Sequence, residues 1–173
     1  VKECSEAMAE GATPKAEAAD KALRNILKSL QMDKEFVAIA AETLKNGGVK
    51  GRKLAEDLFY AALKNNTEDA MEIFETYSLD KQASPQELVK MADALVEREI
   101  SGIKLGIFIS QAIENFKAEK ARPDYVAPLV DWMIHFNPNQ AMSIISDDLK
   151  SKVPYFRDHI HSFLAPLREQ NPD

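Results

Sequence analysis

Apolar residues recur along most of the chain at intervals of three and four positions, the spacing that places side chains on one face of an α-helix. Helix starts also carry their own signals. Ser84-Pro85-Gln86-Glu87 combines a capping serine, a first-turn proline and a glutamate that can return the capping bond. We predict helices over residues 15–30, 33–45, 52–64, 67–77, 85–100, 102–120, 125–136 and 138–150, and a last helix that opens at Pro154.

The helix predicted over 102–120 differs from the others because apolar residues surround much of its first half. A helix that is apolar on most sides is usually buried, so we place it at the centre of the molecule. Gly102, Gly106 and Ser110 are four residues apart and leave room for another backbone to approach. In a lipid bilayer this spacing is typical of helix dimerisation, but here we expect close internal packing.

Short turns join the predicted helices in antiparallel pairs of about 35 residues each. A shift of 71 residues aligns segment 54–78 with segment 125–149, and the pairs Asn66 with Asn137 and Ala70 with Ala141 become identical. Pairs of this size stack into arrays in which each unit buries its apolar face against its neighbours. The predicted fold is therefore all-α, a tandem array of antiparallel helical hairpins resembling an α-solenoid, with a C-terminal capping helix. The alternative is a globular multi-helix bundle around helix 102–120.

Composition agrees with an all-helical chain. The 173 residues include 23 alanines but only 4 threonines, 6 glycines and 8 prolines, which excludes an all-β fold. This length corresponds to about one domain. We expect a flexible N-terminal arm over 1–12, a single helical domain over 13–167 and a polar tail over 168–173.

The formal net charge of −6 argues against a protein that binds duplex nucleic acid, which needs a basic surface. The excess acid lies in residues 51–100, with 11 acidic against 6 basic residues. Glu68, Glu72 and Glu75 share one face of a predicted helix, and either serve as a solvated surface or contact a basic partner. We take these three glutamates as the candidate partner-binding residues.

Segment 45–53 is locally basic and glycine-rich, and is predicted as a loop between two helices. Lys50, Arg52 and Lys53 lie next to a helix start, where exposed backbone N–H groups and the helix dipole favour an anion. An anion- or RNA-binding site at these residues is therefore the alternative to a flexible loop with solvated charges. The segment does not fit the P-loop spacing.

The sequence carries no recognisable catalytic, metal or cofactor motif. Cys4 stands alone, so neither an internal disulfide nor a cysteine zinc site can form. His159 and His161 would point to different sides of a helix, and His135 is expected at a helix end. We expect no cofactor, no metal and no enzymatic activity. An enzyme assembled from distant residues, at His135 or His159, is the third hypothesis.

These features favour protein–protein recognition, in which a helical surface holds a peptide or helix of a partner protein. The longest apolar stretch, residues 100–113, is too short and too interrupted to cross a bilayer. One cysteine and no signal peptide suggest a cytoplasmic protein. The sequence opens at Val1 rather than Met, so a missing targeting segment is the alternative.

Overall fold

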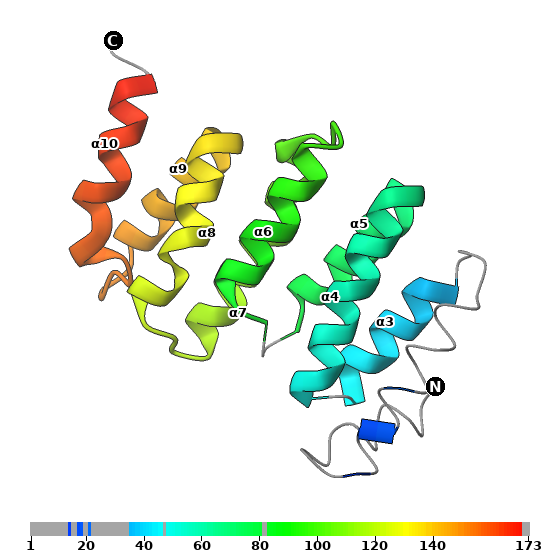
Figure 1. Ribbon diagram of the computed structural model, residues 1–173. Helices are drawn as coiled ribbons and strands as arrows, with labels where there is room; N and C mark the ends of the chain where they lie inside the picture. Colours follow the sequence, from blue (N-terminus) through cyan, green and yellow to red (C-terminus); the bar gives the residue numbers. More distant parts are fainter. Residues whose placement is uncertain are drawn as a thin grey trace. The chain divides into compact units, whose positions relative to one another are not determined.

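The computed structural model describes residues 35–46, 48–80 and 83–170, together with isolated helical positions between 14 and 21. All regular secondary structure in these residues is helical, which confirms the all-α prediction (Figure 1). The arm predicted over 1–12, most of helix 15–30 and Cys4 lie outside the described residues. The helices are α3 (Glu35–Asn46), α4 (Gly48–Asn65), α5 (Thr67–Ser78), α6 (Pro85–Val96), α7 (Gly102–Ala118), α8 (Pro123–Phe136), α9 (Pro138–Leu149), the 3₁₀ helix η1 (Arg157–His159) and α10 (Ile160–Gln170).

The chain divides into two compact units at the boundary between Asp80 and Lys81. The described helices of the first unit are α3, α4 and α5, and those of the second are α6 to α10. Each unit has its own buried apolar side chains, such as Phe59 and Phe74 in the first and Leu88 and Met133 in the second. The single domain expected over 13–167 stays a prediction.

In the first unit, α3 and α4 pack closely at Gly51. A Cβ atom added to Gly51 would overlap the backbone carbonyl oxygen of Thr43, so only glycine fits there. Gly48 opens α4 with a left-handed φ of 53°, which glycine adopts without strain. The chain reverses again at Asn66, whose side chain accepts a hydrogen bond from the backbone N–H of Glu68 and caps α5.

In the second unit, α8 rather than α7 is the central helix, since α8 packs against α6, α7, α9 and α10. The expectation that helix 102–120 lies at the centre and is buried on most sides is therefore wrong. Ile103 and Ile107 on α7 are 68% and 61% exposed. Periodicity identified the helix correctly, but it could not show that the neighbouring helices cover only one side of it.

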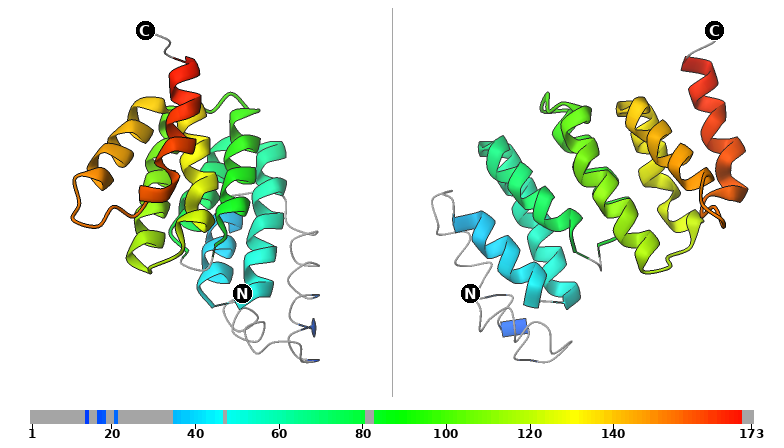
Figure 2. Two further views of the ribbon diagram at one scale, coloured as in Figure 1. Left: turned by 90° about the vertical axis from the view of Figure 1, so that its left-hand side faces the viewer. Right: turned by 180° about the vertical axis from the view of Figure 1, so that it is seen from behind.

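The small residues of α7 do allow a close internal approach, as predicted. A Cβ atom on Gly102 would meet Phe136, and one on Gly106 would meet the side chain of Asn137. The end of α8 and the turn into α9 therefore fit against this stripe, and α7 and α9 lie side by side (Figure 2). No helix in the described part of the chain is both long and apolar enough to span a membrane.

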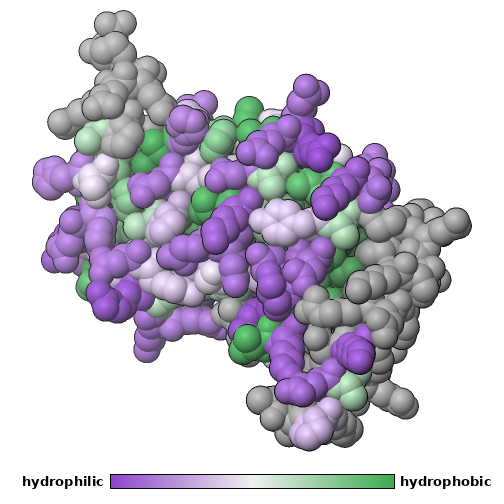
Figure 3. Space-filling model, viewed as in Figure 1, coloured by the Kyte–Doolittle hydropathy of each residue, from purple (hydrophilic) through white to green (hydrophobic). Residues whose placement is uncertain are grey.

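The C-terminal segment begins and ends later than predicted. Pro154 precedes η1 instead of opening a helix, and α10 starts at Ile160. The helix continues to Gln170, so the first residues of the predicted polar tail are helical, while residues 171–173 are outside the described chain. Hydrophilic side chains are intermixed with smaller hydrophobic areas on the face drawn in Figure 3, as expected of amphipathic helices.

Candidate functional site

A groove of about 640 Å³ lies on the second unit between α7, α9 and the segment that follows α9; we call it the α7/α9 groove. Its lining mixes polar, charged and apolar side chains, with three carboxylates against one ammonium group. The lining residues are Glu114 and Lys117 of α7, Gln140, Ser143, Ile144, Asp147 and Asp148 of α9, and Ser151, Val153 and Tyr155 of the following segment.

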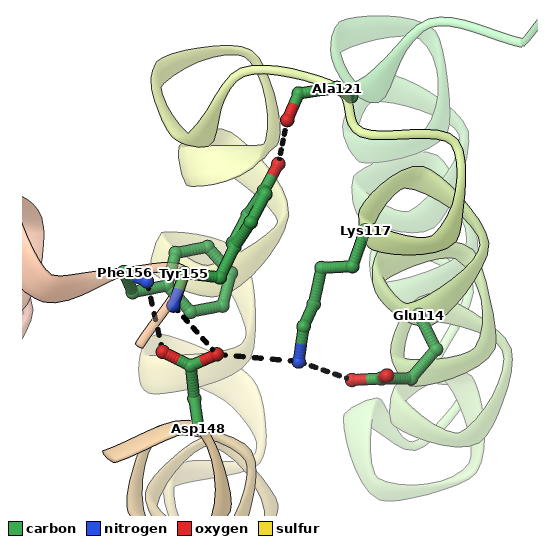
Figure 4. Close-up of polar contacts among 6 residues, drawn as sticks. All are labelled: Glu114, Lys117, Ala121, Asp148, Tyr155 and Phe156. Carbon is green, nitrogen blue, oxygen red and sulfur yellow. Dashed lines mark hydrogen bonds and ion pairs between the residues drawn. The ribbon is translucent and has the colours of Figure 1, made fainter. Parts of the chain in front are cut away.

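One wall of the α7/α9 groove is held by Asp148 (Figure 4). Its buried carboxylate accepts hydrogen bonds from the backbone N–H groups of Tyr155 and Phe156 at 3.2 and 2.9 Å. Lys117 lies 3.5 Å from the same carboxylate and 3.0 Å from Glu114. These contacts tie the segment after α9 to α7, so Asp148 is fully used in shaping the groove.

Tyr155 connects the segment after α9 to the rest of the second unit at another point. Its hydroxyl donates a hydrogen bond to the backbone carbonyl of Ala121, in the turn between α7 and α8. Burial raises the pKa of the Tyr155 phenol above its ordinary value, and the nearby Asp148 carboxylate raises this pKa further. The phenol is therefore neutral at physiological pH and acts as a donor, because the environment disfavours the phenolate.

A polar network sets how α7 and α9 meet at the other end of the groove. The amide of Asn137 donates to the Gln140 side-chain oxygen at 2.7 Å, and the Gln140 amide donates to the Ser110 hydroxyl. Ser110 in turn donates to the backbone carbonyl of Gly106. Because these groups satisfy one another, the two helices are held in one register along the groove.

Exposed apolar side chains lie at both ends of this surface. Ile103 and Ile107 share a face of α7 with Glu114, since positions 4 and 11 residues apart on a helix lie close to one another around its axis. In the segment after α9, Val153 is 79% exposed. Exposed apolar side chains beside a groove are typical of surfaces that bind other proteins.

The predicted acidic face is on the surface of the first unit. Glu68, Glu72 and Glu75 lie on α5 and all three are exposed. They belong to a different unit from the α7/α9 groove. Their role as a partner contact stays a prediction.

The basic residues Lys50, Arg52 and Lys53 lie on the first turns of α4. The helix starts before the predicted residue 52, so most of the loop expected over 45–53 is helical. The helix begins at Gly48, and Gly51 in its first turns lies against α3. Lys53 contacts Glu56 and Asp57 of its own helix at 2.8 and 3.4 Å, and its hydrogen bond to Glu56 raises its pKa. These contacts favour a helix surface with paired charges, and anion binding there stays a prediction.

The three histidines do not form a common site. His135 and His161 are exposed, on α8 and α10 respectively, while His159 lies in η1. The His159 imidazole is 2.7 Å from Asp124, whose pKa is lowered by its hydrogen bond with Arg122 and, more weakly, by the charge of His159. Within the described residues, no three potential ligands lie close enough together to hold a metal ion.

Sequence reasoning missed the α7/α9 groove because its residues come from segments that are far apart along the chain. Lys117 and Asp148, for example, are in contact although the whole of α8 lies between them in the sequence. The signal that pointed nearest to the groove was the Gly102, Gly106 and Ser110 stripe, which predicted a close neighbour for α7 but not which helix it was.

Comparison with known proteins adds no functional precedent. No protein-family model, no curated protein and no solved structure matches the chain. A functional assignment therefore depends on the residues and geometry described above.

Proposed function

We propose that this protein recognises another protein, and that a peptide or helix of the partner binds in the α7/α9 groove. The observation that carries this proposal is the open groove of about 640 Å³, lined by two helices and bordered by exposed apolar side chains. Partner helices commonly bind by laying an apolar face into a groove between helices. No catalytic role is proposed, because the polar groups at the centre of the groove hold its wall together.

The predicted array of antiparallel hairpins is part of this proposal, since such arrays present helices side by side for binding. Two observations support it. Asn66 alone joins α4 to α5, and Asn137 alone joins α8 to α9. In both cases the two consecutive helices pack against each other.

The acidic face of Glu68, Glu72 and Glu75 is a second proposed contact for a basic partner. Replacing these glutamates by lysine should weaken binding of that partner.

An affinity capture experiment with matched variants tests the proposed function. Ser143 is exposed and lines the groove, so Ser143→Arg should obstruct it without disturbing the core. Ser162→Arg makes the same change at an exposed position on α10 and serves as the control. The fluorescence of Trp132, which is buried and bonded to Asp93, checks that both variants are folded.

We expect proteins bound by the wild type to be retained by Ser162→Arg and lost by Ser143→Arg, as quantified by mass spectrometry. If Ser143→Arg captures the same proteins as the wild type, the groove is not the binding surface and the proposal is wrong.

A further inference from the structure

We draw no further inference here: the strongest candidate, the exposed apolar face of α7 at Ile103 and Ile107 beside the α7/α9 groove, carries none, because nothing in the structure shows what covers it.

Discussion

Single residues of this chain matter most where two backbones meet. At Gly51 the absence of a side chain lets α4 approach the carbonyl of Thr43 on α3, and at Gly102 and Gly106 it lets α7 approach Phe136 and Asn137. The three positions are in helices, where glycine costs about 1 kcal/mol relative to alanine. The close packing offsets this cost.

We predict that Gly51→Ala destabilises the first unit although alanine is the better helix former. The added methyl group overlaps a backbone oxygen, which a side-chain rotation cannot relieve, and overpacking of this kind costs about 1–3 kcal/mol. Urea unfolding followed by circular dichroism measures the change. Val49→Ala, at a position on the same helix that is 74% exposed, should change stability by less than about 0.5 kcal/mol. A gain in stability for Gly51→Ala would contradict the packing described.

Among the elements, the two aligned helix pairs show how equal sequence signals lead to different contacts. Asn66 and Asn137 both follow a helix and precede the next one, with φ values of −146° and −149°. Asn66 uses its side chain to cap α5, whereas Asn137 donates to Gln140 and packs on Gly106. The common sequence thus encodes the turn, while the neighbouring helix decides the use of the side chain.

The segment between α9 and α10 gives a prediction about pH. Because the folded protein raises the pKa of Tyr155, the neutral phenol stabilises the fold fully below its ordinary pKa of about 10, and this stabilisation is lost as the pH rises through the folded pKa. Tyr155→Phe removes the hydrogen bond to Ala121 and should cost about 1 kcal/mol at neutral pH.

The difference in unfolding free energy between wild type and Tyr155→Phe should shrink above about pH 10, as measured by urea unfolding across the pH range. Tyr125→Phe, at a position that is 41% exposed, is the control and should stay close to wild type. A difference that is the same at every pH would mean that the Tyr155 hydroxyl does not contribute through this bond.

At the scale of the whole molecule, the division at Asp80 and Lys81 separates two sets of buried side chains. Trp132 is the only tryptophan of the chain and belongs to the second unit, so its fluorescence reports on that unit alone. Circular dichroism, in contrast, reports on the helices of both units. The two signals together can distinguish one cooperative domain from two.

We predict that the units unfold separately. Leu54→Ala creates a cavity in the first unit, where Leu54 is 1% exposed, and should cost about 2–5 kcal/mol. It should shift part of the circular dichroism transition and leave the Trp132 transition in place. Leu88→Ala, at a fully buried position of the second unit, should instead shift the Trp132 fluorescence transition. If Leu54→Ala shifts both signals equally, the single domain predicted over 13–167 is supported instead.

The sequence by itself determined the helices, because helix formation depends on residues within a few positions of one another. The apolar periodicity, the Ser84 capping box and the Asn66 turn are all local signals, and each is found in the structure. The small residues of α7 also indicated that another segment packs closely against this helix. Element boundaries were predicted less accurately: α4 begins at Gly48, whereas the helix was predicted from residue 52.

Only the tertiary structure decided which apolar faces are covered and which distant groups meet. Several amphipathic helices present similar stripes, so the pattern did not show that α8 is central or that Ile103 and Ile107 of α7 stay exposed. The contact between Lys117 and Asp148, which shapes the groove, depends on the register of two helices that are not consecutive. Such contacts arise from packing between whole helices, for which the order of apolar and polar residues along the chain carries no distinct signal.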